Sequence, residues 1–209
     1  MKSFLLGDDH AVVRSGLKQL LIDEFQHVNV GEAANANDVL SLARNQRWDI
    51  VILDINLPGR SGLDVLSELK KEPIKVPVLV LSMHPEDQFA IRALKAGASG
   101  YLTKESAPEE LIKAVNKILA GGKYISDTLA EKLAIGLEAG SEKPPHELLS
   151  DREFQVLRMI GSGKTPSQIA EELHLSIKTI STFRARILEK MNMKTNAELI
   201  RYSIEKKLA

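Results

Sequence analysis

The sequence predicts an α/β domain with a five-stranded parallel sheet in the order 2-1-3-4-5, followed by an all-α helical domain. Over the first 120 residues, short apolar runs alternate with stretches whose apolar residues recur at helical spacing. Five such strand–helix units favour a parallel sheet, because parallel strands need crossover connections that pack back onto the sheet. After residue 145 the strand pattern stops and only helix starts follow.

The predicted strands are short and end at turn-forming or polar residues. The central strand, residues 49–54, is an aliphatic and β-branched run that is followed by Pro58-Gly59, which is typical of a strand buried on both faces. The alternation of strands and helices is the flavodoxin-like pattern. The other strands are expected near residues 4–7, 28–33, 76–81 and 99–102, and the helices near 12–21, 39–43, 62–69, 88–94 and 108–119.

The composition indicates a two-domain protein of a reducing compartment. A length of 209 residues suits two domains of unequal size, and the absence of cysteine excludes disulfides and thiolate metal sites. The longest apolar runs are too short to cross a bilayer and the N-terminus lacks a signal segment, so we expect a cytoplasmic protein with no membrane partner. Residues 146–209 hold 11 basic and 8 acidic side chains, against 17 and 20 in residues 1–145, which favours the second part as the polyanion binder.

A linker with one short helix is predicted at residues 121–147. The amphipathic part covers residues 127–137, and the following Gly, Ser, Glu and Pro mixture can bury little surface. We therefore place the first domain at residues 1–120 and the second at residues 148–209.

Four helix starts are predicted in the second domain. Three match the capping box, in which the cap hydroxyl accepts the N3 amide and the N3 side chain returns to the cap amide. Pro166 falls at a first helical position, where its missing donor is tolerated, and Ser176 is a simpler cap. The capping boxes pair Ser150 with Glu153, Thr165 with Gln168 and Thr195 with Glu198.

Polar side chains gather where the predicted strands end. Asp8 and Asp9 follow the first strand, and Asp54 ends the third, which is its neighbour in the flavodoxin-like order. Carboxylates this close repel one another unless a proton or a cation intervenes, and oxygen ligands select a hard ion such as Mg²⁺. Each aspartate alone is adequately explained as a loop acid. The joint placement with Ser82 and Lys104, at the ends of two further strands, favours a functional site.

These residues resemble the receiver domain of two-component response regulators, over roughly residues 1–120. The resemblance implies phosphoryl transfer, which asks the protein mainly for positioning and charge neutralisation. The matching residues are Asp8, Asp9, Asp54 with Leu57-Pro58-Gly59, Ser82, Tyr101 and Lys104.

The resemblance also implies a role for each residue. Asp54 is the nucleophile that takes a phosphoryl group from a sensor histidine kinase as an acyl phosphate, with at most slow self-dephosphorylation and no other enzymatic activity. Mg²⁺ is bound by Asp9, Asp54 and the backbone carbonyl of Asn56, with Asp8 acting through water. In the phosphoryl-binding and switch set, an ammonium pairs with phosphoryl oxygens, a hydroxyl moves to bind the group and a tyrosine rotates inward. These three residues are Lys104, Ser82 and Tyr101.

A helix, a tight turn and a second helix are predicted within residues 167–191. A helix-turn-helix places its second helix in the major groove of duplex DNA, where Lys and Arg contact phosphates and Ser and Thr reach bases or backbone. An ordinary helical hairpin with a solvated basic face would give the same charge pattern, which leaves both interpretations open. Phe183 is the one aromatic candidate for stacking, so duplex DNA is preferred to single strands.

The second domain resembles the LuxR-type DNA-binding domain, through residues 149–157, Gly163, Ile169-Ala170 with Leu173, and residues 176–182. Together the two resemblances indicate a response regulator of the NarL/FixJ subfamily. They imply a transcription regulator that binds duplex DNA as a homodimer through its last helix, with RNA polymerase as a further candidate partner. The implied DNA-contacting residues are Lys178, Thr179, Ser181, Thr182, Arg184, Ala185 and Arg186.

Two other functions would also use an aspartate at a sheet edge. A phosphohydrolase of the haloacid dehalogenase kind has an Asp-x-Asp pattern, which would need an acid where this chain has Asn56. An adaptor would use the receiver fold for protein contacts without phosphorylation. Beryllofluoride should change the oligomeric state of a regulator and leave that of such an adaptor unchanged.

Overall fold

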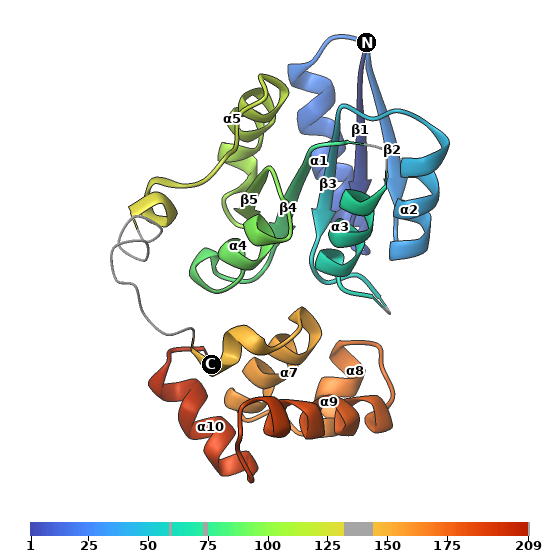
Figure 1. The fold of residues 1–209 in the computed structure, drawn as a ribbon. Helices are drawn as coiled ribbons and strands as arrows, with labels where there is room; N and C mark the ends of the chain where they lie inside the picture. The colour runs from blue at the N-terminus through green and yellow to red at the C-terminus, as the bar shows by residue number, and fades with distance from the viewer. Residues whose placement is uncertain (59, 73–74, 132–143, 209) are drawn as a thin grey trace. The chain divides into compact units, whose positions relative to one another are not determined.

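The computed structural model describes residues 1–58, 60–72, 75–131 and 144–208 and divides into two compact units, Met1–Glu138 and Ala139–Ala209. The first unit contains a parallel sheet in the order β2-β1-β3-β4-β5, which confirms the predicted topology (Figure 1). Its strands are β1 (Lys2–Gly7), β2 (Val28–Ala33), β3 (Ile50–Asp54), β4 (Val78–Ser82) and β5 (Gly100–Thr103), and its helices are α1 (Ala11–Glu24), α2 (Ala36–Asn45), α3 (Gly62–Lys71), α4 (Glu86–Lys95) and α5 (Ala107–Leu119).

The two faces of the sheet are covered by different helices. α1 and α5 pack against each other on one face, and α2 packs against α3 on the other. Phe4 and Leu6 of β1 join Leu17 of α1 and Leu111 of α5 in one core, because alternate side chains of a strand point to the same face. β3 is buried along its whole length, as its apolar run predicted, and β4 is buried in the same way. Because all five strands are parallel, their carboxyl ends lie at one edge of the sheet.

The chain returns to the sheet after α5. The Tyr124 amide donates to the carbonyl oxygen of Ser99 at 2.8 Å. The Ser126 amide and hydroxyl both donate to the Glu86 carboxylate, at the start of α4. Residues 127–131 are helical, and the rest of the helix predicted there lies outside the described residues. The first residues of the predicted linker are thus held against β5 and α4.

The second unit is helical, and its caps are those predicted. All three capping boxes form, and the Ser176 hydroxyl accepts the Thr179 amide at 3.1 Å. Throughout the described ranges, every helix is too short or too polar to span a lipid bilayer. A short 3₁₀ turn, η1 (Pro145–Leu148), precedes α7 (Asp151–Gly161), α8 (Pro166–Glu172), α9 (Ile177–Lys190) and α10 (Asn196–Glu205).

The predicted tight turn separates α8 from α9. His174 adopts a left-handed backbone conformation with φ of 51°, and the Leu175 amide returns to the Ala170 carbonyl at 2.8 Å. A left-handed residue followed by an amide that returns to a carbonyl of the last turn is a common way for an α-helix to end. The chain then starts α9 at its N-cap one residue later. α8 and α9 form the helix-turn-helix expected from the sequence.

Replacing Gly62 should destabilise the first unit, because Gly62 opens α3 directly behind Asp54. A Cβ atom at Gly62 would lie 2.0 Å from the Asp54 carbonyl oxygen. We expect Gly62→Ala to lower the free energy of unfolding of this unit by about 1–3 kcal/mol through overpacking. Urea titration followed by the fluorescence of Trp48, the one tryptophan of the chain, reports on this unit.

Gly16→Ala is the matched control. Gly16 lies inside α1, and no atom lies within 4 Å of the position that an added Cβ would take, so alanine should stabilise the helix by about 0.5–1 kcal/mol. An unchanged urea midpoint for Gly62→Ala would contradict the close approach of α3 to Asp54.

Candidate functional site

Three carboxylates converge at the carboxyl edge of the sheet. Asp8 and Asp9 follow β1, and Asp54 ends the adjacent β3. Ligand atoms of these three residues and of His10 all lie within 4.8 Å of one another. Asp8 and Asp54 are each only 2% exposed, so water screens their charges poorly.

Lys104 lies between two of these carboxylates. It follows β5, and its Nζ atom is 2.7 Å from Asp8 Oδ2 and 2.7 Å from Asp54 Oδ2. Its side chain is only 7% exposed, and its peptide bond to Glu105 is trans. One ammonium balances only one of the two negative charges that it contacts, so Lys104 and the two carboxylates together keep a net negative charge.

The surroundings shift the pKa values of both Asp54 and Lys104. Burial raises the pKa of Asp54 above its ordinary value, although the Lys104 ammonium and the Asn56 amide act in the opposite direction. Burial also works to lower the pKa of Lys104, but the Asp54 and Asp8 carboxylates outweigh it and raise that pKa. Lys104 is therefore held as a cation beside Asp54.

The donor set fits a hard divalent cation. The carboxylate oxygens of Asp8, Asp9 and Asp54 converge and retain negative charge after pairing with Lys104. The Asn56 amide donates to Asp54 Oδ1 at 3.0 Å, which holds the backbone of residue 56 beside the cluster. Mg²⁺ prefers oxygen ligands and takes one or two carboxylates together with waters and phosphoryl oxygens.

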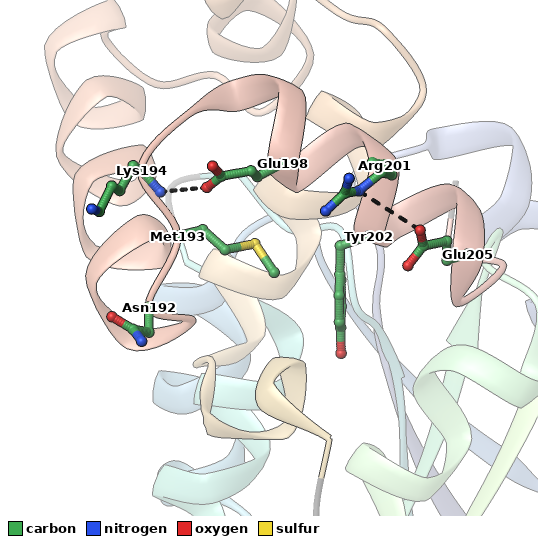
Figure 2. Close-up of a pocket in the computed structure, with 7 residues that line it drawn as sticks. All are labelled: Asn192, Met193, Lys194, Glu198, Arg201, Tyr202 and Glu205. Atoms are coloured by element: carbon green, nitrogen blue, oxygen red, sulfur yellow. Dashed lines mark hydrogen bonds and ion pairs between the residues drawn. The ribbon is translucent and has the colours of Figure 1, made fainter.

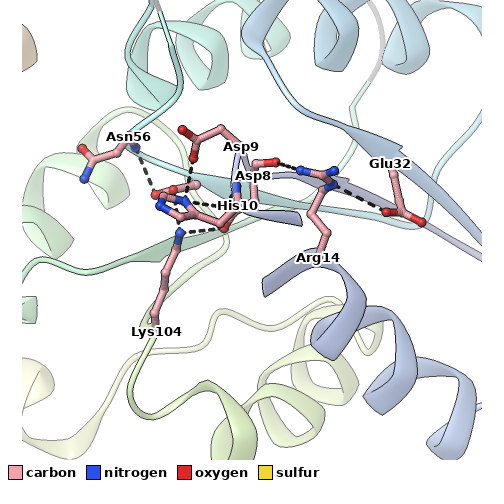
Figure 3. A network of polar contacts seen from close by, with 8 residues as sticks. Asp8, Asp9, His10, Arg14, Glu32, Asn56 and Lys104 are labelled. Carbon is pink, nitrogen blue, oxygen red and sulfur yellow. Dashed lines mark hydrogen bonds and ion pairs between the residues drawn. The ribbon is translucent and has the colours of Figure 1, made fainter. Parts of the chain in front are cut away.

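Two side chains beside the cluster, those of His10 and Arg14, were not predicted from the sequence (Figure 3). His10 Nδ1 lies 2.7 Å from Asp9 Oδ1, and its position directly after the acid pair was the available signal. Arg14 Nη1 donates to the backbone carbonyl of Asp8 at 2.6 Å. Helical periodicity selects apolar positions of α1, so it gave no reason to single out a charged side chain in its first turn.

Ser82 and Tyr101 meet at the loop after β4. The Ser82 hydroxyl oxygen accepts the His84 amide at 3.0 Å, and the Tyr101 hydroxyl donates to the His84 carbonyl at 2.8 Å. Tyr101 is fully buried, with an exposure of 0%. Its hydroxyl bond lets the polar tip enter the interior without losing a partner.

α9 exposes most of the side chains proposed to contact DNA. Ile180 and Ile187 are buried against the unit, which turns the opposite face to solvent. The Ser181 and Thr182 hydroxyls donate to carbonyls one turn earlier, at 3.0 Å each. Thr179 is partly buried, and the exposed members of the set are Lys178, Ser181, Thr182, Ala185 and Arg186.

Arg184 differs from the rest of this set. It is partly buried, and its Nε donates to Asn196 Oδ1 at 2.5 Å, which ties α9 to the first residue of α10. This contact links residues 12 positions apart, and helical spacing within α9 gave no signal for it. Arg184 therefore has a structural contact besides any contact with DNA.

A pocket of about 360 Å³ lies along α10 (Figure 2). Arg201 and Glu205 form an ion pair at 3.7 Å, and Glu198 accepts the Lys194 amide at 2.6 Å. Ile204 on the same helix is 63% exposed. α10 thus carries an apolar side chain in solvent beside paired charges.

Each of the two units matches a known family of domains. Residues 4–116 match the response regulator receiver domain, and residues 147–203 match the bacterial regulatory proteins of the luxR family. The response regulator UvrY of Escherichia coli K12 is 33% identical over 205 residues, which cover 98% of this chain and 94% of UvrY.

Two solved structures of RcsB are similar to this chain. The first, from Salmonella enterica serovar Typhimurium, is bound to the rprA promoter in the presence of the phosphomimetic BeF₃⁻; it is 25% identical, covers 97% of this chain and 98% of its own, and has a TM-score of 0.64. The second shows two RcsB dimers bound to two parallel DNAs; it is 25% identical, covers 96% and 97%, and has a TM-score of 0.59. The chain belongs to the NarL/FixJ family of two-component response regulators, DNA-binding transcription regulators in which a receiver domain is joined to a LuxR-type helix-turn-helix domain.

Proposed function

We propose that this protein regulates transcription in response to phosphorylation of Asp54 by a sensor histidine kinase. The observation that carries the proposal is the buried Asp54 carboxylate beside Lys104, in a chain that also exposes a basic helix in a helix-turn-helix. The receiver would comprise residues 1–120, the linker 121–147 and the DNA-binding domain 148–209. Its proposed partners are a sensor histidine kinase and duplex DNA. We further propose that it acts in the cytoplasm, with at most slow self-dephosphorylation.

The chemistry proposed for Asp54 is nucleophilic. One of its carboxylate oxygens forms a bond to phosphorus while the bond from phosphorus to the donor histidine nitrogen breaks, giving an acyl phosphate. Lys104 then pairs with phosphoryl oxygens as a point charge. Mg²⁺ would be held by Asp9, Asp54 and the Asn56 carbonyl, with Asp8 acting through water, and it supplies neutralisation of the phosphoryl charge.

Ser82 and Tyr101 are proposed to sense the phosphoryl group. The Ser82 hydroxyl would give up the bond that it accepts from the His84 amide and would donate a hydrogen bond to a phosphoryl oxygen on Asp54. The carbonyl of the same His84 binds the Tyr101 hydroxyl, so a shift of this loop reaches Tyr101 directly. A charge change that biases a loop between two arrangements is a common basis for regulatory switching.

The first residue of α4, directly after this loop, contacts the linker. Three residues separate Ser82 from Glu86, whose carboxylate accepts the Ser126 amide and hydroxyl. The Ser126 hydroxyl oxygen also accepts the Leu129 amide at 3.1 Å, which caps the helix that starts the linker. These contacts support a route from Asp54 to the DNA-binding domain through the β4–α4 loop.

α9 is proposed to enter the major groove of duplex DNA. Ser181, Thr182 and Ala185 would face the bases, with Lys178, Thr179, Arg184 and Arg186 near the phosphates. α10 would form a homodimer interface on a two-fold site, which its exposed Ile204 and the DNA-bound dimers of RcsB support. RNA polymerase is proposed as a further partner.

Asp54→Asn should abolish acyl phosphate formation, because an amide oxygen is a poor nucleophile at phosphorus. Incubation with acetyl phosphate and Mg²⁺, followed by intact-mass measurement, would show one added phosphoryl group on the wild type and none on the variant. Asp64→Asn is the control, since Asp64 is exposed on α3 and should leave phosphorylation unchanged. Equal phosphorylation of the wild type and Asp54→Asn would contradict the assignment.

Arg186→Ala should weaken binding to duplex DNA and flatten its salt dependence. Each phosphate contact that is lost lowers the slope of log K against log salt by about 0.9. Fluorescence anisotropy with a mixed-sequence duplex at several salt concentrations measures this slope. Lys71→Ala removes an exposed charge from the first unit and should leave the slope unchanged. An unaltered slope for Arg186→Ala would favour the ordinary helical hairpin.

A further inference from the structure

The acid pair lies in a very short connection. β1 ends at Gly7 and α1 begins at Ala11, so residues 8–10 must direct two carboxylates to one point against their mutual repulsion. The N-cap of α1 is His10, whose side chain makes no capping hydrogen bond. The Asp8 carboxylate instead accepts the His10 amide at 2.8 Å, so the side-chain bond that holds this turn uses one of the acids of the proposed metal site.

Arg14 supplies a different hold on this turn. Its Nη1 donates to the backbone carbonyl of Asp8 at 2.6 Å, and its Nε lies 3.5 Å from Glu32 Oε2 (Figure 3). The Arg14 side chain is only 16% exposed. One guanidinium thus connects the end of β1, the first turn of α1 and β2, and its rigid fork suits contacts in two directions.

Glu32 is itself fixed at the far end of this connection. Lys18 Nζ lies 2.8 Å from Glu32 Oε1. This hydrogen bond, with a smaller contribution from Arg14, holds the pKa of Glu32 below its ordinary value. Glu32 therefore stays a carboxylate at neutral pH, with its Oε2 at ion-pair distance from Arg14.

We propose that Arg14 is a positioning residue that holds the Asp8-Asp9 turn in the geometry that binds Mg²⁺. Arg14 reaches the backbone carbonyl of Asp8 and not its carboxylate, which already contacts Lys104 and the His10 amide. The inference rests on the metal site of the proposed function. Residues that orient ligands from outside commonly change metal affinity by about 10–100-fold.

The direction of the change in Mg²⁺ affinity distinguishes a positioning role of Arg14 from a purely electrostatic one. The Arg14 guanidinium is a cation that contacts the backbone of a proposed Mg²⁺ ligand, so removing its charge alone would tighten Mg²⁺ binding. Loss of the hold on the Asp8 carbonyl would weaken binding instead. A weaker affinity in Arg14→Met is therefore evidence for positioning, because electrostatics predicts the opposite change.

Isothermal titration calorimetry of the full chain with MgCl₂ tests the proposal. We expect Arg14→Met to weaken Mg²⁺ binding on the order of tenfold. Arg14→Lys keeps the charge but cannot span both partners, so it should also bind Mg²⁺ more weakly than the wild type; this milder change tests the proposal even if Arg14→Met fails to fold. Lys71→Met is the matched control, since it removes an exposed positive charge of the first unit at a residue outside the contacts among Asp8, Arg14 and Glu32, and its affinity should equal that of the wild type.

A second readout separates positioning from general stability. Phosphorylation by acetyl phosphate should be slower in Arg14→Lys at low Mg²⁺ and should return to the wild-type rate at saturating Mg²⁺. Equal or tighter Mg²⁺ binding in both Arg14 variants, an equal loss in Lys71→Met, or a defect that persists at saturating Mg²⁺ would overturn the proposal. Absence of Mg²⁺ binding in the wild type would instead overturn the proposed metal site, and this inference with it.

Discussion

The contact of Lys104 with Asp8 and Asp54 is the interaction on which the rest of the receiver site depends. Both carboxylates are buried at the ends of adjacent strands, where each would otherwise remain an uncompensated charge. Removing one partner of a buried ion pair commonly destabilises a protein by about 3–5 kcal/mol. The pairing is incomplete because one ammonium serves two acids. The site is therefore stable enough to fold and still attracts further positive charge.

This incomplete neutralisation suits a reversible charge switch. A phosphoryl group and a cation would both change the balance of charge around Lys104, and the loop after β4 is the element that we propose to respond. In this loop the His84 amide donates to the Ser82 hydroxyl oxygen, and the His84 carbonyl accepts the Tyr101 hydroxyl. Glu86, the first residue of α4 directly after this loop, accepts the Ser126 hydroxyl near the start of the linker. Polar contacts thus bind this loop to Ser82 and Tyr101, and bind the start of α4 to the chain that leads to the second unit.

The second unit is organised differently, around bonds that are local in sequence. Its capping boxes start three helices independently of any partner, and Glu153 shows how one of them becomes part of the tertiary structure. Glu153 returns to the Ser150 amide at 2.8 Å and also contacts Lys190 of α9 at 2.6 Å. Burial opposes ionisation of Glu153, but these two partners outweigh it and lower its pKa. The helix start and the packing of α7 on α9 therefore stabilise each other.

The sequence alone determined the strand order, the helix caps and the gathering of acids around Asp54. These depend on periodicity, on neighbours three residues apart and on the rule that parallel strands end at one edge, all of which can be read along the chain. Only the tertiary structure decided that Arg14 turns back to the Asp8 carbonyl, that Tyr101 is fully buried and that Arg184 contacts Asn196. Each of these depends on which side-chain conformation finds a partner on another segment once the elements have packed, and sequence spacing carries no record of that choice.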